Sequence, residues 1–235
     1  MSRSNPTTKN PAVKFFSWAG SRGELVHWDK DESKEIVEKL PFTFMVLDEL
    51  STITGYSDED SSGYWSNEVR NIKKDELIVK TGKGTKQTGK YDDLTDVRSK
   101  GAKYAKSVYI AYKDGNTLAI GNFKVFGSSL SAWIDLSKKA DVYKTAVVIT
   151  GKSDVQTKGK TEYYYPLFET TKVTDDTNKE AVELDRELQT YLSNYFSVKE
   201  ADEENVAYPS LSGQVPLEAY DGMDLEAVDM GEIPF

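Results

Sequence analysis

Residues 42–57 read FTFMVLDELSTITGYS. Aromatic and β-branched residues dominate this stretch, and apolar and polar side chains alternate along much of it. That pattern is typical of a strand with one face against a hydrophobic core, because successive side chains of a strand point to opposite faces. The stretch therefore predicts one long or broken β-strand.

Further strand patterns lie on both sides of this stretch. AGSRG separates VKFFSW from ELVHWD, and the turn sequence Asp114-Gly115-Asn116 separates SVYIAYK from TLAIGNFKVF. Each arrangement predicts a β-hairpin, because turn residues stand between two runs of strand-forming residues. The remaining strands are predicted within residues 63–72, 76–81, 143–159 and 160–173.

Helices are predicted within residues 33–40, 91–106, 128–139 and 177–196. The last is the clearest, because Ala181, Leu184, Leu188, Leu192 and Phe196 fall on one face. KGTKQTGKY at residues 83–91 has no apolar anchor and predicts a mobile basic loop.

These patterns predict a mainly β body of about seven to nine strands with a few helices. Strands do not alternate with crossover helices, which argues against a doubly wound sheet. We expect a β-barrel of the antiparallel type, in the form of an elaborated OB-fold. The predicted organisation is a flexible arm at 1–11, an OB-like body at 12–198 and a disordered acidic tail at 199–235.

The composition excludes several kinds of chemistry. The chain has no cysteine and a single histidine, His27. Disulfides, thiolate nucleophiles and cysteine-based zinc sites are therefore excluded, and few residues remain for metal or triad chemistry. The sequence shows neither an apolar run of membrane-spanning length nor a signal-peptide pattern. We expect a cytoplasmic protein that is not an enzyme and needs no cofactor.

Charge is distributed unevenly along the chain. Residues 1–198 carry 29 Lys+Arg and 29 Asp+Glu, whereas residues 199–235 carry 1 and 10, so the formal net charge of -9 lies in the tail. Within the body, residues 70–113 carry 12 Lys+Arg against 5 Asp+Glu. A basic segment of this kind indicates a binding site for a polyanion such as nucleic acid.

The C-terminal residues are Asp229-Met230-Gly231-Glu232-Ile233-Pro234-Phe235. This segment resembles the tip of bacterial single-stranded DNA-binding proteins, which end in a run of acids followed by Ile-Pro-Phe. A body followed by an acidic tail with a terminal aromatic residue is also similar to the layout of tailed-phage single-stranded DNA-binding proteins. The resemblance implies a protein that coats and protects single-stranded DNA without strong sequence preference, in the cytoplasm of a bacterial host cell if it is phage-encoded.

The same resemblance implies that the tip recruits replication, recombination and repair proteins. Phe235 would fill an apolar pocket of a partner, while its carboxylate, Asp229 and Glu232 meet basic residues at the rim. Ile233 and Pro234 complete the motif, and Pro234 limits the conformational freedom that is lost on binding. Without a partner, the tail would fold back on the basic surface and compete with nucleic acid.

Binding a single strand without sequence preference requires aromatic faces for the bases and Lys or Arg for the phosphates. The aromatic candidates in predicted strands and loops are Trp18, Trp28, Tyr56, Tyr64, Trp65, Tyr91, Tyr109, Tyr112, Tyr163 and Tyr164. The basic candidates in the predicted loops are Lys80, Lys83, Lys86, Lys90, Lys158 and Lys160. The alternative interpretation is core packing for each aromatic residue and a solvated surface for the lysines.

Other functions fit parts of the sequence. Residues 84–90 have the spacing of an ATPase P-loop, but Tyr91 follows where Ser or Thr should bind magnesium. Asp58, Glu59 and Asp60 could hold magnesium in a nuclease, but no strand-borne Glu-x-Lys accompanies them. A strand-annealing recombination protein that forms rings or filaments, and an acidic adaptor or inhibitor that does not bind DNA, stay open as alternatives, as does a homo-oligomer.

Overall fold

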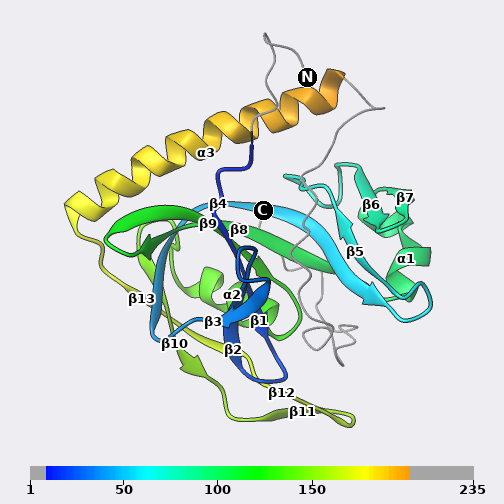
Figure 1. Cartoon of the computed structure of the whole chain (residues 1–235), viewed down its shortest axis with the longest axis horizontal. Helices are drawn as coiled ribbons and strands as arrows, with labels where there is room; N and C mark the ends of the chain where they lie inside the picture. The colour runs from blue at the N-terminus through cyan, green and yellow to red at the C-terminus, as the bar shows by residue number, and fades with distance from the viewer. Residues whose placement is uncertain (1–8, 202–235) are drawn as a thin grey trace.

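The computed structural model describes residues 9–201, which form a mainly β protein with a large branched sheet and three α-helices (Figure 1). The strands are β1 (Lys14–Ala19), β2 (Glu24–Asp29), β3 (Lys34–Val37), β4 (Phe42–Ser57), β5 (Ser62–Ser66), β6 (Leu77–Thr81), β7 (Gly84–Gly89), β8 (Ala102–Asp114), β9 (Thr117–Val125), β10 (Ala146–Lys152), β11 (Gln156–Lys158), β12 (Thr161–Tyr163) and β13 (Pro166–Thr171). The helices are α1 (Thr95–Ser99), α2 (Ser128–Lys139) and α3 (Asp175–Ala201), with a 3-10 turn at Tyr91–Asp93. The mainly β prediction is confirmed.

Strand β4 is the centre of the sheet. β8 pairs with it in antiparallel orientation along most of its length, β10 pairs with its first residues and β5 pairs with its last. The sheet therefore branches at β4, with one branch formed by β10 and β13 and another by β5, β6 and β7. On the opposite edge of β8 lie β9, β1, β2 and β3, and β1 runs parallel to β9.

A register shift interrupts β4 between Val46 and Asp48. Before the shift Phe44 and Val46 face the core that contains α2, and after it Ile53 faces the same core. A bulge inserts one residue into a strand and so changes the phase of its alternation. The residues from 42 to 57 thus form one long strand with a bulge, which explains why the alternation in the sequence is incomplete.

Apolar cores lie on both faces of β4 and β8. One core contains Phe44, Ile110 and Trp133 of α2, together with residues of α1. The other contains Tyr109 of β8 and Leu188 of α3, so α3 covers the outer face of the sheet (Figure 1). Burying apolar surface on both faces accounts for the near-continuous burial of the middle of β8. None of the helices in the described part of the chain combines the length and hydropathy needed to cross a membrane.

Three local predictions are corrected. Residues 33–40, predicted as helical turns, contain strand β3, because Ile36 and Val37 pair with β2. The helix predicted over 91–106 is only a 3-10 turn and α1, since Gly101 with φ 109 follows and β8 begins at Ala102. The predicted mobile loop KGTKQTGKY contains β7, which pairs with β6 as an edge strand.

A closed barrel is not shown, and the OB-fold stays a prediction. In the described residues, β13 forms its ladder with β10 alone. The backbone N–H of Tyr164 donates to the carbonyl oxygen of Gly20 at 2.8 Å, which links the β1–β2 turn to the segment before β13. This bond joins the two segments outside any strand ladder.

Candidate nucleic-acid interface

A row of side chains crosses four strands near the end of β4. Lys103 in β8 pairs with Thr54 in β4, and Thr54 pairs with Trp65 in β5. Trp65 pairs in turn with Lys80 in β6. Paired residues of neighbouring strands point to the same face of a sheet. We name these four residues the Trp65 row, in which partly exposed Trp65 lies next to partly exposed Lys80, and buried Thr54 separates it from partly exposed Lys103.

Trp65 differs from the two buried tryptophans. The indole N–H of Trp18 donates to the carbonyl oxygen of Tyr164 at 2.9 Å, and that of Trp133 donates to the Glu49 carboxylate at 2.9 Å. Within residues 9–201 the Trp65 indole has neither a hydrogen bond nor a ring stacked on it. Trp65 is partly exposed, and stacking on a nucleic-acid base requires an exposed aromatic side chain.

Tyr56 extends this surface toward the β4–β5 turn. It lies two residues beyond Thr54 in β4, on the same face and diagonal to Trp65. Its partner in β5 is Gly63, and a Cβ on Gly101 would lie 2.2 Å from the Tyr56 carbonyl oxygen. The positions on both sides of Tyr56 thus carry no side chain, and Tyr56 is partly exposed.

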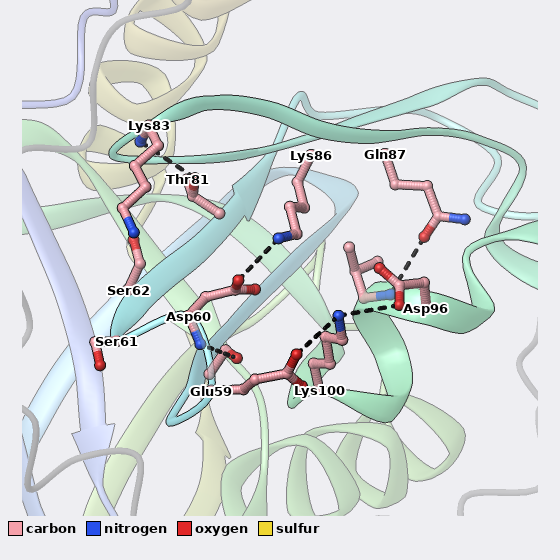
Figure 2. Close-up of polar contacts among 12 residues, drawn as sticks. Glu59, Asp60, Ser61, Ser62, Thr81, Lys83, Lys86, Gln87, Asp96 and Lys100 are labelled. Atoms are coloured by element: carbon pink, nitrogen blue, oxygen red, sulfur yellow. Dashed lines mark hydrogen bonds and ion pairs between the residues drawn. The ribbon is translucent and has the colours of Figure 1, made fainter.

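Two hairpin turns lie side by side next to this part of the sheet (Figure 2). The backbone N–H of Gly82 in the β6–β7 turn donates to Ser62 Oγ at 3.3 Å, which joins this turn to the first residue of β5, directly after the β4–β5 turn. Lys86 Nζ of β7 lies 2.8 Å from Asp60 Oδ1. This lysine and the Tyr64 hydroxyl hold the pKa of Asp60 below its usual value.

A second lysine at these turns is also held by carboxylates. Lys100, which follows α1, places Nζ 3.3 Å from Glu59 Oε1 and 3.2 Å from Asp96 Oδ1 (Figure 2). These hydrogen bonds raise the pKa of Lys100. The acidic turn between β4 and β5 therefore neutralises two lysines that come from separate elements.

The structure separates the lysines that were predicted in the basic loop. Lys80 belongs to the Trp65 row, and Lys86 forms the ion pair with Asp60. Lys83 and Lys90 are exposed at the two ends of β7. Only Lys80 among these four shares a cross-strand row with Trp65.

Five of the predicted stacking residues are buried, and their assignment is corrected. They are Trp18, Tyr64, Tyr91, Tyr109 and Tyr112. The Tyr109 hydroxyl donates to the Glu68 carboxylate at 2.8 Å, and the Arg98 guanidinium lies 4.3 Å from the centre of the Tyr91 ring. Burial raises the pKa of all four tyrosines. Rings enclosed in this way offer no open face to a base, because the cores use them for packing.

The remaining predicted contacts lie apart from the Trp65 row. Lys158 and Lys160 are exposed at the tip of the β11–β12 hairpin, and Tyr163 lies in its second strand. This hairpin projects at the opposite side of the molecule from α3 (Figure 1). The Tyr164 ring lies 4.3 Å from Lys152 Nζ at the base of the hairpin.

Trp28, the fourth tryptophan, is partly exposed in β2. Its partner in β3 is Glu35, whose carboxylate binds Arg22. An aromatic ring beside a carboxylate suits a phosphate backbone less well than one between two lysines. Trp28 is thus a partly exposed tryptophan without the basic neighbours of Trp65.

The structure shows the surroundings of the P-loop-like segment and of the acidic residues that suggested a nuclease. The P-loop-like residues 84–89 form strand β7 in a ladder with β6, so they do not form a loop that could enclose phosphate. Among the described residues, no three or more His, Asp or Glu side chains gather as metal ligands. Asp60 and Glu59 contact lysines instead.

Lys103 and Lys100 are not among the contact residues predicted from the sequence. Lys103 alternates with the buried Tyr104 in AKYAKSVY, which was the available signal for a strand with an outer face. Because residues 91–106 were predicted as a helix, Lys103 was not assigned to a strand. No sequence pattern marks Lys100, because its contact with Glu59 depends on the tertiary packing of segments that are distant in the sequence.

The predicted partner-binding residues Asp229, Glu232, Ile233, Pro234 and Phe235 lie outside the described residues. Of the predicted arm, residues 9–11 are described, and the Asn10 side chain donates to the Tyr109 hydroxyl at 3.2 Å. No protein-family model, curated protein or solved structure matches this chain.

Proposed function

We propose that the chain binds single-stranded DNA through the Trp65 row and Tyr56, and that it protects the strand without catalysing a reaction. The observation that carries this proposal is the partly exposed Trp65 in one cross-strand row with Lys80 and Lys103. A base stacked on an aromatic side chain contributes about 1–3 kcal/mol, and neighbouring lysines follow the phosphates. This combination recognises any base, because every base has a face that can stack.

The same geometry favours a single strand over a duplex. Trp65 and Tyr56 present their rings on an outer sheet face, on diagonal positions about 7–8 Å apart by ordinary sheet spacing. Only bases whose faces are exposed can stack there, whereas a duplex keeps its bases stacked on one another. The β11–β12 hairpin, with Lys158 and Lys160, would supply a second and purely electrostatic contact.

The acidic C-terminal segment completes the proposed function. By its resemblance to bacterial single-stranded DNA-binding proteins, Phe235 and its neighbours recruit proteins of replication, recombination or repair. The protein would then act in the bacterial cytoplasm, holding DNA with its body and partners with its tail.

The test is a comparison of Trp65→Ala with Trp28→Ala, since both residues are partly exposed tryptophans on strands. Fluorescence anisotropy would measure binding of the full chain to labelled oligo(dT) and to a duplex of equal length. We expect the wild type to prefer oligo(dT) and Trp65→Ala to weaken that binding about 5- to 150-fold, the loss of one stacked base. Trp28→Ala should stay within about twofold.

Circular dichroism melting would show that both variants fold. If the wild type does not bind oligo(dT), the proposed function is wrong. If it binds and the two tryptophan variants behave alike, the protein binds single strands at another surface.

A further inference from the structure

The outer face of the sheet extends from the Trp65 row to the part that α3 covers. Successive side chains of a strand point to opposite faces. Along β8 the outer face therefore carries Lys103, Ala105, Ser107, Tyr109 and Ala111. The core beneath α3 contains Tyr109 and Ala111 of this strand, but not Ala105 (Figure 1). The stretch from Lys103 to Ser107 thus leads from the Trp65 row toward α3.

Lys124 of β9 lies beside this stretch of β8. It pairs with Ser107 of β8 on one side and with Ser17 of β1 on the other. Paired residues of neighbouring strands point to the same face of a sheet, so Lys124 lies on the face that carries Lys103. Both serines are buried, whereas Lys124 is partly exposed. A long basic side chain is thus flanked by two short ones.

Within residues 9–201, Lys124 forms no ion pair. The carboxylate that acts on it electrostatically is Glu68, whose Oε1 accepts the Ser107 hydroxyl and whose Oε2 accepts the Tyr109 hydroxyl at 2.8 Å. Burial lowers the pKa of Lys124, and Glu68 opposes this shift without reversing it. A cation that is partly withdrawn from water and has no paired anion is costly. A phosphate at this position would remove that cost through charge-assisted hydrogen bonds.

Lys106 is a neighbouring lysine that has a carboxylate partner. It precedes Ser107 in β8 and therefore lies on the opposite, inner face of the sheet. Its Nζ lies 2.6 Å from Oε2 of Glu49, and both side chains are largely buried. The inner lysine is neutralised within the protein, whereas Lys124 on the outer face is not paired in this way.

We propose that Lys124 binds a phosphate of the DNA strand that stacks on Trp65. This inference rests on the proposed function and extends its site across β8 to β9. The path crosses five neighbouring strands, β6, β5, β4, β8 and β9, which is about 19 Å at ordinary strand spacing. Between the Trp65 row and Lys124 it passes Ala105 and its partner Thr52, which are buried and have no large or charged side chain.

The test is Lys124→Gln in the full chain, which removes the charge and keeps most of the side chain. Fluorescence anisotropy would measure binding to labelled oligo(dT) across a salt series, with thermal melting as the check on folding. We expect Lys124→Gln to weaken binding about two- to tenfold at low salt. The slope of log affinity against log salt should become shallower by about 0.7, because one phosphate contact with a single strand releases about that many counterions.

Two further variants serve as controls. Lys113→Gln removes the charge of an exposed lysine on the same face at the other end of β8, where it pairs with Leu118. It should change the affinity by less than about twofold and leave the salt slope as in the wild type. Lys124→Arg keeps the charge and should keep the wild-type salt slope.

Each other outcome overturns the phosphate contact. If Lys124→Gln and Lys113→Gln have equal effects while the wild type binds and Trp65→Ala weakens binding, Lys124 does not touch the strand and the proposed function stands. If Lys124→Gln weakens binding without changing the salt slope, Lys124 acts through the packing of the sheet and not through a phosphate. If the wild type does not bind oligo(dT), both proposals fail.

Discussion

Adjacent residues of β5 show how much a single position depends on the face it occupies. Tyr64 and Trp65 are both aromatic and both were candidates for stacking, but they point to opposite faces of the strand. Tyr64 is 2% exposed and donates its hydroxyl hydrogen to Asp60, whereas Trp65 is partly exposed between Lys80 and Thr54. The face of the sheet, and not the residue type, decides which ring is open to a ligand.

Gly101 is a residue where backbone geometry excludes any side chain. Its φ is 109°, and a Cβ there would lie 2.2 Å from the carbonyl oxygen of Tyr56. We expect Gly101→Ala to lower the free energy of unfolding by about 1–3 kcal/mol, because strain and a backbone clash add together. Urea denaturation measures the change. Gly151→Ala is the control, since no atom lies within 4 Å of its added Cβ, and an equal loss at both sites would contradict this account.

At the scale of elements, α3 is joined to the connection between β5 and β6 as well as to the sheet. The Glu68 N–H in that connection donates to the Tyr195 hydroxyl at 2.9 Å, and the Arg70 guanidinium lies 5.4 Å from the centre of the Phe196 ring. The Gln189 side chain donates to Asp48 Oδ2 at 2.9 Å. α3 thus holds the segment that directly follows the strand of Trp65.

Tyr195→Phe removes the hydroxyl from this attachment and keeps the ring. We expect it to lower the free energy of unfolding by about 0.5–1.5 kcal/mol, because the Glu68 N–H loses its acceptor. Tyr143→Phe is the matched control, since Tyr143 is 56% exposed. Chemical denaturation of both variants would measure the difference. A Tyr195→Phe variant as stable as the control would mean that water replaces the hydroxyl.

Local sequence patterns predicted those strands and helices whose own residues favour that structure. β4, the β1–β2 and β8–β9 hairpins, α2 and α3 follow from alternation, turn residues and an apolar helical face. Edge strands β3 and β7 were missed, because pairing with β2 and β6 stabilises them more than their own residues do. Tyr56, Trp65 and Lys80 were predicted as contact residues from the sequence, but their proximity in space was not. It depends on the register between β4, β5 and β6, which pairs residues that are not adjacent in the chain.

In the whole molecule, the charges are distributed unevenly along the sequence. All 30 Lys+Arg and 29 of the 39 Asp+Glu lie in residues 1–199, so this part has a formal charge of +1 (30 minus 29), against -9 for the full chain. A strand of DNA would therefore meet a nearly neutral body and a strongly negative tail. Repulsion between tail and DNA should reduce affinity at low salt.

A chain that ends at Lys199 tests this effect. We expect it to bind oligo(dT) more tightly than the full chain, with the difference shrinking as salt screens the charges. Anisotropy titrations across a salt series would measure both affinities. In a matched full-length variant, the ten acids after Lys199 are replaced by Asn and Gln, and this variant should tighten binding to a similar extent. A tightening that does not depend on salt would contradict the electrostatic explanation.

Binding of DNA to the Trp65 row is tested most directly by locating the DNA on the protein. Ultraviolet cross-linking of the full chain to oligo(dT), followed by mass spectrometry of the digested protein, identifies the residues that touch bases. We expect cross-links in the peptides that contain Tyr56 and Trp65, and their loss in Trp65→Ala. Cross-links confined to Trp28 or to the β11–β12 hairpin would place the bound strand elsewhere and contradict binding at the Trp65 row.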